Sequence, residues 1–344
     1  MNLYVHFPFC RRKCRYCALY SRVGTSAADR NSYVQRLAST LKNGACPQFS
    51  IGDRPYSTVY FGGGSPALCD LSPILAALRP YLTSETEFTV ELHPLDVTDD
   101  LLLRLRDGGV NRISMGVQSL DDATLAAMGR GYTALEAAHA FARVKKVFNN
   151  AGTDLIVGYP GDPCADYSSL ADWGQTHVSV YSLQNERGLK DVPSDDWVLD
   201  RIRDIASFLS SIGLERYEIS NYAAPGFECR HNFAVWRGED YIGLGEGACG
   251  RIGLKRTRNF GACPHRAGGA CPQVETVTAE RDEVERRIFR LRTREGLDAT
   301  GHPDWGQTLQ KFCKEGLLVE QEGNVYHLTE RGTEVCDAIL SELV

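Results

Sequence analysis

Short apolar runs recur through the first two thirds of the chain, and between them lie longer segments whose apolar residues return every three or four positions. The short runs predict strands. They cover residues 3–7, 58–61, 88–92, 112–117, 154–158, 178–183 and 216–219. Because strands that alternate with helices pair in parallel through crossover connections, the pattern predicts an α/β sheet or barrel.

Three of the intervening segments carry helix-end signals. Ser72 and Pro73 suit the N-cap and the first helical position of one helix. Thr98 suits the N-cap of a second helix, which should stop near Gly108. A third apolar stripe runs from Leu199 to Ile212, and its helix should end near Gly213. We interpret all three stripes as faces that pack on the sheet.

The pattern changes near residue 280. Helices are predicted at 281–292 and 305–315, followed by two short strands around a turn at 322–324 and a final helix. This order predicts a small winged-helix-like α+β domain at 280–344, after a barrel domain at 1–250 and a linker or loop at 251–279. The C-terminal domain is not notably basic, so we expect a lid or docking role and not DNA binding.

Composition narrows the class of protein. The chain has 344 residues, 43% of them hydrophobic, enough for one large core and one smaller core. A net charge of -6 and a pI near 5.8 argue against a nucleic-acid or membrane-surface binder. No run of about 18 apolar residues occurs, and no signal peptide is evident. We therefore expect a cytoplasmic protein without an integral membrane segment.

Three cysteines near the start, Cys10, Cys14 and Cys17, carry the most specific chemistry. Three soft thiolates on one short loop can hold three irons of a 4Fe-4S cluster and leave the fourth iron open. Twelve cysteines in a long chain without a signal peptide fit reduced thiols and a metal site better than disulfides. Cys263 and Cys271 could bind a second metal or cluster, although their wide spacing fits no standard site.

The surroundings of this cysteine run strengthen the signal. Tyr16 lies inside it, Tyr4 precedes it on a predicted strand, and a glycine-rich turn, 61–66, follows another predicted strand. A backbone without side chains can approach a small ligand closely. In a parallel barrel, ligands bind at the carboxyl ends of the strands, where this turn, the cysteine run and Glu91 all fall. Together these segments resemble the radical S-adenosylmethionine superfamily.

Later segments resemble one branch of that superfamily, the oxygen-independent coproporphyrinogen oxidase-like family, nearly from end to end. They are VYFGGGSP, ELHP, ISMGVQSLDD, GRGYT, DLIVGYPGD, YEISNYAAPGFECRHN, WRGEDYIGLGEGA and LTERG. The resemblance implies a partial (β/α)6 TIM-like barrel with a small C-terminal winged-helix-like α+β domain. A barrel that lacks two strands would leave a lateral opening large enough for a tetrapyrrole.

The same resemblance implies roles for individual residues. Cys10, Cys14 and Cys17 would ligate the cluster. The residues implied to bind S-adenosylmethionine are Tyr4, Tyr16, Gly63, Gly64, Ser65, Glu91, Gln118, Arg130 and Asp154. Carboxylates facing an ammonium group or ribose hydroxyls, and a guanidinium facing a carboxylate, favour one ligand orientation. The structural alternative for Glu91, Arg130 and Asp154 is a set of buried ion pairs.

Two subgroups of the family compete. Coproporphyrinogen oxidases usually carry an N-terminal extension, whereas the cysteine motif here begins at Tyr4. Heme chaperones of the HemW type begin like this chain and carry a His-Asn-x-x-Tyr-Trp motif, which His231, Asn232 and Trp236 match while Val235 replaces the tyrosine. Histidine can ligate heme iron and tryptophan can stack on the macrocycle. An equally open alternative is that His231 serves a structural hydrogen-bond network.

The resemblance to the chaperones implies heme or a porphyrin as ligand, a heme-acceptor protein, and an electron donor such as flavodoxin. The alternative is an enzyme that oxidises coproporphyrinogen III or modifies another tetrapyrrole. A substrate with several carboxylates needs convergent cations, and the cluster loop carries four: Arg11, Arg12, Lys13 and Arg15. These cations could instead be solvated, or offset the charge of an anionic cluster.

Overall fold

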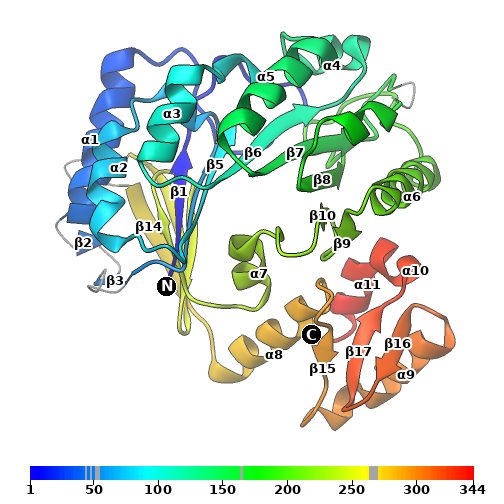
Figure 1. The fold of residues 1–344 in the computed structure, drawn as a ribbon. Helices are drawn as coiled ribbons and strands as arrows, with labels where there is room; N and C mark the ends of the chain where they lie inside the picture. Colours follow the sequence, from blue (N-terminus) through cyan, green and yellow to red (C-terminus); the bar gives the residue numbers. More distant parts are fainter. Residues whose placement is uncertain (43–44, 47–48, 51–54, 163–165, 263–269) are drawn as a thin grey trace.

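The computed structural model describes residues 1–42, 45–46, 49–50, 55–162, 166–262 and 270–344. Its centre is a curved run of neighbouring parallel strands within a twelve-stranded sheet of the described residues (Figure 1). In spatial order they are β1 (Asn2–Phe7), β4 (Thr58–Gly63), β5 (Glu87–Leu92), β6 (Arg112–Gln118), β7 (Asn150–Val157) and β8 (His177–Ser182). The predicted partial barrel is confirmed.

Helices cover the outer face of these strands. They are α1 (Ala27–Lys42), α2 (Ser72–Leu78), α3 (Asp99–Asp107), α4 (Asp122–Met128), α5 (Ala134–Val147) and α6 (Asp195–Ser211), with short 3-10 turns η1 (Pro66–Leu68), η2 (Arg79–Tyr81), η3 (Pro94–Asp96) and η4 (Ser168–Asp172). Thr98 accepts from the Leu101 amide and caps α3 as predicted. The prediction for Ser72 was wrong, because Leu71 occupies the N-cap position of α2 without a side-chain bond.

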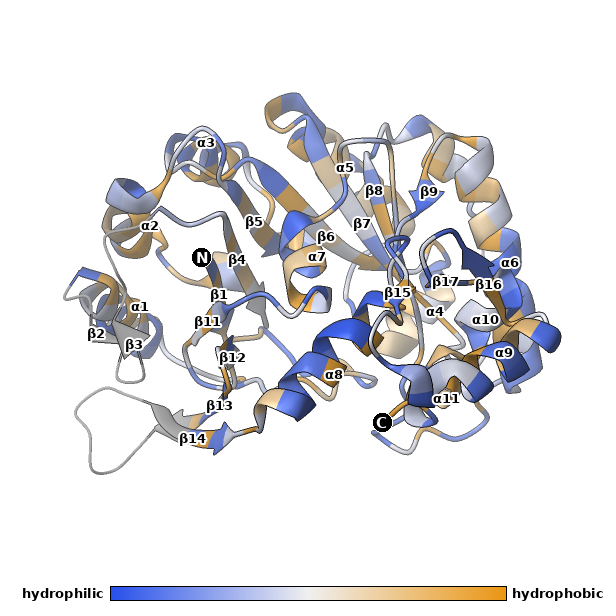
Figure 2. Cartoon of the chain, turned by 90° about the horizontal axis from the view of Figure 1, so that it is seen from below, coloured by the Kyte–Doolittle hydropathy of each residue, from blue (hydrophilic) through white to orange (hydrophobic). Residues whose placement is uncertain are grey.

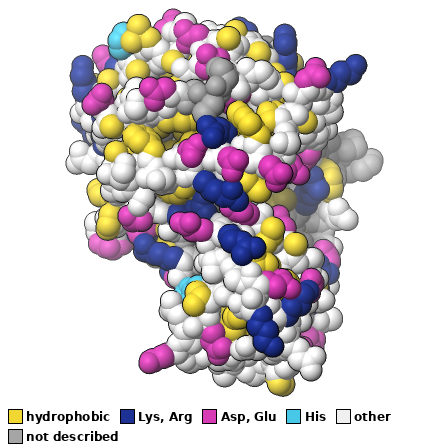
Figure 3. All heavy atoms as spheres, turned by 90° about the vertical axis from the view of Figure 1, so that its right-hand side faces the viewer, with side chains coloured by type: hydrophobic (Ala, Val, Ile, Leu, Met, Phe, Trp, Pro, Cys, Tyr) yellow, Lys and Arg dark blue, Asp and Glu magenta, His cyan; other side chains and the backbone are white. Residues whose placement is uncertain are grey.

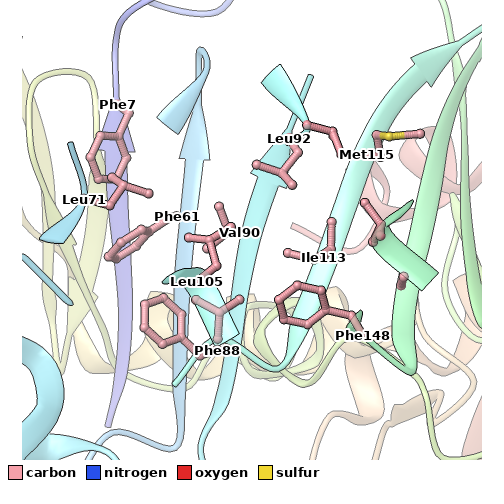
Figure 4. Close-up of a cluster of buried hydrophobic side chains, with 14 of the residues drawn as sticks. Phe7, Phe61, Leu71, Phe88, Val90, Leu92, Leu105, Ile113, Met115 and Phe148 are labelled. Atoms are coloured by element: carbon pink, nitrogen blue, oxygen red, sulfur yellow. The ribbon is translucent and has the colours of Figure 1, made fainter. Parts of the chain in front are cut away.

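Successive side chains of a strand point to opposite faces, and this alternation separates the two surfaces of the barrel wall. Outward residues such as Phe61, Phe88 and Ile113 are fully buried in a continuous apolar core against the helices (Figure 4). The inward residues are mostly polar. They include Tyr4, Thr58, Tyr60, Glu87, Glu91, Arg112, Ser114, Asp154, His177 and Ser179. The chamber inside the barrel is therefore polar.

Further strands extend both edges of the barrel sheet. β11 (Tyr241–Leu244) pairs in parallel with β1, and β12 (Cys249–Ile252), β13 (Lys255–Ala262) and β14 (Ala270–Thr276) continue it antiparallel. β10 (Asn221–Ala223) and β9 (Glu215–Arg216) extend the other edge, also antiparallel. The predicted strand at 216–219 is thus reduced to its first residue. Residues 251–279, for which a linker or loop was predicted, contribute β13 and β14 to the sheet.

The C-terminal part forms a smaller α+β unit with its own buried cluster. It comprises α8 (Ala279–Arg290), β15 (Leu297–Asp298), η5 (Pro303–Trp305), α9 (Gly306–Lys314), β16 (Leu318–Gln321), β17 (Val325–Leu328), α10 (Glu330–Glu334) and α11 (Cys336–Ser341). Its sheet has the order β15-β17-β16. Arg203 of α6 forms an ion pair with Glu334 of α10 at 2.6 Å. On the face of the molecule shown in Figure 3, acidic and basic side chains are intermingled.

The short helix α7 (Arg230–Trp236) lies across the end of the barrel where the parallel strands begin (Figure 2). It follows β10 in the chain and lies between the strands and α8. A two-stranded element, β2 (Ala45–Cys46) with β3 (Phe49–Ser50), follows α1. Among the residues that the structure describes, no helix combines the length and apolarity needed to cross a membrane.

Candidate functional site

The cysteine loop follows β1 and lies at the carboxyl end of the parallel strands. Cys10, Cys14 and Cys17 are free thiols of intermediate exposure. The loop is held by backbone bonds, from the Cys10 amide to the Arg22 carbonyl at 3.0 Å and from the Arg15 amide to the Met128 carbonyl at 3.2 Å. The end of α4 therefore anchors the middle of the loop.

The glycine-rich turn after β4 packs directly on this loop. The Gly64 amide donates to the Phe7 carbonyl at 2.8 Å and the Ser65 amide to the Phe9 carbonyl at 2.7 Å. A Cβ atom on Gly64 would lie 2.5 Å from the Phe9 carbonyl oxygen and 2.9 Å from Cys10 Sγ. Gly63 has φ +108°. Glycine is therefore required where the turn meets the first cysteine.

The three thiols of the cysteine loop suit a 4Fe-4S cluster. No group of three or more His, Cys, Asp and Glu side chains in the described ranges could hold one metal ion. A 4Fe-4S cluster binds each cysteine through a different iron, so its ligands need not converge on one point. Burial raises the pKa of the Cys10 thiol, and a thiolate at this place therefore needs a cationic partner such as a bound metal.

Glu91 lies inside the barrel below the glycine-rich turn. Its carboxylate accepts from the Tyr60 hydroxyl at 2.9 Å and from the Gly63 amide at 3.1 Å. Burial, followed by the nearby Asp154 carboxylate, raises the pKa of Glu91 to about 7. A cationic ligand beside Glu91 would lower the free-energy cost of keeping this buried carboxylate charged.

Asp154 projects into the same chamber from β7. Its two oxygens accept from the Ser114 hydroxyl at 3.0 and 3.2 Å. Burial raises its pKa as well. Among the described residues no ion pair joins either Glu91 or Asp154 to Arg130. The charges of Arg112 and Arg130 nevertheless act on Asp154 and partly offset the effect of burial on its pKa, so the alternative of a buried ion-pair set stays a prediction.

Arg130 connects the cysteine loop to the barrel wall. Its guanidinium donates to Cys14 Sγ at 3.4 Å, to the Tyr16 hydroxyl at 3.3 Å and to the Gly116 carbonyl at 2.6 Å. Gln118 lies close by, with φ +75° at the point where the register of β6 against β7 shifts. The structure thus brings Tyr16, Gln118 and Arg130 together at the carboxyl end of β6.

Tyr4, on β1, belongs to a series of hydrogen bonds that the sequence did not predict. Its hydroxyl bonds His6 Nδ1 at 3.0 Å, and His6 Nε2 bonds the Tyr20 carbonyl at 2.9 Å. Because a neutral ring has one N–H, it donates from Nε2 to the carbonyl and accepts from Tyr4. The signal for His6 was its position two residues after Tyr4, which places both on the inward face.

His231 lies at the opposite end of the chamber, on α7. It is 5% exposed. Its Nδ1 bonds the Thr58 hydroxyl at 2.7 Å, and its ring lies 5.1 Å from that of Tyr60. The Glu87 carboxylate accepts from the His231 amide at 3.0 Å. Burial, then Arg112, lowers the pKa of His231 to about 3, so the ring is neutral.

Trp236, another residue of the predicted heme motif, faces away from His231. Trp236 packs towards the C-terminal part, with the guanidinium of Arg292 4.8 Å above its ring and Phe289 beside it. Asn232 is of intermediate exposure. His231 and Trp236 therefore do not share one face of α7. Cys263 lies outside the described residues, as does the side chain of Cys271, so their predicted role is untested.

Comparison with known proteins defines the class first. The family model that describes the Radical SAM superfamily matches residues 4–173 of this chain. The structure is similar to that of the radical SAM enzyme coproporphyrinogen III oxidase HemN from Escherichia coli, with a TM-score of 0.82 over 99% of this chain and 89% of that chain. At 21% identity this likeness concerns the fold alone. Membership of the superfamily implies a 4Fe-4S cluster and S-adenosylmethionine.

Full-length relatives then define the family. The heme chaperone HemW of Synechocystis is 34% identical over 89% of this chain and 81% of the relative. The heme chaperone HemW of Mycobacterium tuberculosis strain H37Rv is 30% identical over 100% of this chain and 94% of the relative. The chain belongs to the HemW family of radical SAM proteins, which confirms the resemblance inferred from its motifs.

Proposed function

We propose that this protein is a cytoplasmic heme chaperone that carries a 4Fe-4S cluster, binds S-adenosylmethionine and passes heme to an acceptor protein. Relatives of that name cover nearly the whole chain. The partners on this proposal are heme or a porphyrin, a heme-acceptor protein, and an electron donor such as flavodoxin.

Cys10, Cys14 and Cys17 would hold the cluster, which when bound supplies an iron with an open coordination position. Glu91 would accept from the ammonium group of the cofactor. Asp154 and Gln118 face the same chamber and would bind other polar groups. The carboxylates of Glu91 and Asp154 suit this ligand, because S-adenosylmethionine carries a sulfonium and an ammonium group, and buried carboxylates gain from cationic partners.

The observation that favours a chaperone over a coproporphyrinogen oxidase is the charge inside the barrel. Glu91 and Asp154 are both buried carboxylates whose pKa values are raised. Arg112 and Arg130, the inward cations of the described strands and loops, are 1% and 8% exposed. Arg130 is already bonded to Gly116 and Tyr132. Heme and coproporphyrinogen III both carry carboxylates, but coproporphyrinogen III carries more of them and would meet the stronger repulsion from Glu91 and Asp154. Arg112, whose Nε has no hydrogen-bond partner among the described residues, would offset part of this repulsion.

The cations of the cysteine loop do not offset this repulsion. Arg11 pairs with Asp96 at 2.6 Å, and Lys13 donates to the Ser21 hydroxyl at 2.7 Å. Arg12 and Arg15 are exposed. The loop therefore offers two uncommitted guanidinium groups at the outer surface, where they are solvated.

The deciding experiment is an anaerobic heme titration of the cluster-loaded protein, followed by absorption, with and without S-adenosylmethionine. A shifted Soret band at stoichiometric heme is expected. In parallel, the same protein receives coproporphyrinogen III, reductant and cofactor, and carbon dioxide and protoporphyrinogen are measured. Oxidation of the porphyrinogen without heme binding would replace the chaperone by the enzyme.

A further inference from the structure

Asp96 lies behind the cysteine loop, on the 3-10 turn η3 that follows β5. Its side chain is 2% exposed. Oδ1 accepts from Arg11 Nε at 2.8 Å and from Arg11 Nη2 at 2.6 Å, and Oδ2 accepts from the Ser65 hydroxyl. One buried carboxylate thus joins three segments: the cysteine loop, the glycine-rich turn and η3.

This junction surrounds Cys10. Arg11 is the next residue in the chain, and Ser65 follows Gly64, whose Cα approaches Cys10 Sγ so closely that a Cβ would lie 2.9 Å away. The Ser65 amide also donates to the Phe9 carbonyl. The position of the Cys10 sulfur is therefore fixed by the turn on one side and by the Arg11–Asp96 pair on the other.

The bond to Asp96 also limits which other bonds the Ser65 hydroxyl can form. A hydroxyl has one hydrogen to donate, and Ser65 donates it to Asp96 while the residue itself is 6% exposed. The family resemblance implied that Ser65 binds S-adenosylmethionine. In this structure the hydrogen of the Ser65 hydroxyl goes instead to the buried carboxylate of Asp96, and little of the residue is exposed to a ligand.

We propose that Asp96 is a positioning residue that locks the cysteine loop onto the glycine-rich turn, and that the Ser65 side chain acts through this lock and not by contact with the cofactor. The inference rests on the proposed cluster at Cys10, Cys14 and Cys17. A carboxylate removed from water is stabilised by charge-assisted bonds from both partners, so loss of its charge releases both segments.

The test measures how tightly the cluster is held. Asp96→Asn and Arg11→Gln are loaded with cluster anaerobically, and the rate of iron loss to an excess of chelator is followed by absorption. Each variant should lose iron about tenfold faster than the parent, as is usual when a supporting partner of a metal site is removed. Arg11→Lys, which keeps the charge, should restore part of the difference. Asp96→Asn removes the buried charge, so the unfolding temperature of this cluster-free variant should stay close to the parent. Arg11→Gln leaves the Asp96 carboxylate buried with Ser65 as its remaining partner, so its unfolding temperature should fall.

Asp100→Asn is the matched control, because Asp100 forms an exposed ion pair with Arg104 at 3.1 Å on α3. It should release iron at the parental rate. Adding Ser65→Ala to Asp96→Asn should not accelerate iron loss further, since both act in one network. If Ser65→Ala weakened S-adenosylmethionine binding by the same factor in the parent and in the Asp96→Asn background, the role given to Ser65 would be overturned.

Two failures are distinguishable. If the parent holds the cluster and Asp96→Asn and Arg11→Gln release it at the parental rate, the positioning role is wrong and the proposed function stands. If the parent takes up no cluster at all, the proposed function fails and this inference fails with it.

Discussion

Tyr60 donates its hydroxyl to Glu91 across 2.9 Å, and this bond lies between the two ends of the chamber. Above it the other Glu91 oxygen accepts from the Gly63 amide, and below it the Tyr60 ring lies beside His231. Although both bonds favour the charged carboxylate, burial and Asp154 outweigh them and raise the pKa of Glu91 to about 7. The proposed partner of the cofactor ammonium thus changes charge near neutral pH.

Binding of S-adenosylmethionine should therefore strengthen with pH. Glu91 is about one-tenth ionised at about pH 6 and about nine-tenths at about pH 8, so affinity should rise about tenfold over this interval. Calorimetry or the cofactor-induced change in the electron paramagnetic resonance spectrum measures it. Glu91→Gln should bind weakly with a flatter pH profile. Equal pH profiles for parent and variant would contradict the assignment.

The raised pKa of Glu91 should also make the folded protein less stable as pH rises, whereas cofactor binding should become stronger. Since the folded pKa lies above the ordinary 4.5, the unfolded chain releases this proton first as pH rises. The contribution of Glu91 to stability is therefore present below about pH 4.5 and is lost between there and about pH 7. In Glu91→Gln, urea denaturation of the cluster-free protein should show a smaller decline across that interval.

The cysteine loop gives the next prediction. Alanine at Cys10, Cys14 or Cys17 should abolish stable cluster binding, because each would remove one of three iron ligands. Iron content after anaerobic reconstitution, about four per chain in the parent, is the measurement. Cys313→Ala, in the C-terminal part, is the control and should keep its iron. Full cluster content in the three loop variants would refute the metal site.

Sequence patterns predicted the barrel because its strands obey two simple rules. Outward positions such as Phe61 and Phe88 had to be apolar to pack on helices, and turns with special backbone needs, such as Gly63, had to be glycine. The helix at Thr98 was predictable for the same local reason. The antiparallel strands β13 and β14 were missed, because exposed alternating residues there resemble a loop in composition.

The site was predictable only where a motif was local. The three cysteines lie within eight residues, whereas Asp96 reaches Arg11 across 85 positions of the chain. Likewise, Thr58 meets His231 only because α7 returns to the beginning of β4. Such pairs depend on tertiary packing, and no spacing in the sequence marks them.

Glu87 gives a prediction about the floor of the barrel. Its carboxylate accepts from the Arg230 and His231 amides, each at 3.0 Å, and so caps the first turn of α7. Glu87→Gln keeps one acceptor and loses the charge, which should cost about 1–2 kcal/mol of stability. Urea denaturation measures the loss. Glu85→Gln is the control, since the Glu85 side chain is exposed, and a Glu87→Gln variant as stable as this control would disprove the cap.

The last prediction separates two roles of His231. The ring uses Nδ1 for the bond to Thr58, so Nε2 is the nitrogen left for heme iron. Heme would have to enter the chamber, or α7 would have to move, since the residue is 5% exposed. His231→Asn can keep the bond from the Nδ1 position but offers no atom in place of Nε2. His231→Ala removes both functions.

If His231 ligates heme, His231→Asn should fold with near-parental stability and lose the shifted Soret band, while cluster absorbance and cofactor binding persist. If the histidine is structural, His231→Asn should keep heme affinity. His231→Ala should then lose about 1 kcal/mol of stability from the bond to Thr58, and more from the lost packing of the ring, while the Thr58 hydroxyl keeps its bond to Asn2. Thr58→Val leaves the imidazole in place but removes its bond to Thr58, together with the bond from Thr58 to Asn2. Parental heme binding in His231→Asn would exclude axial ligation by this residue and direct the search to other side chains of the chamber.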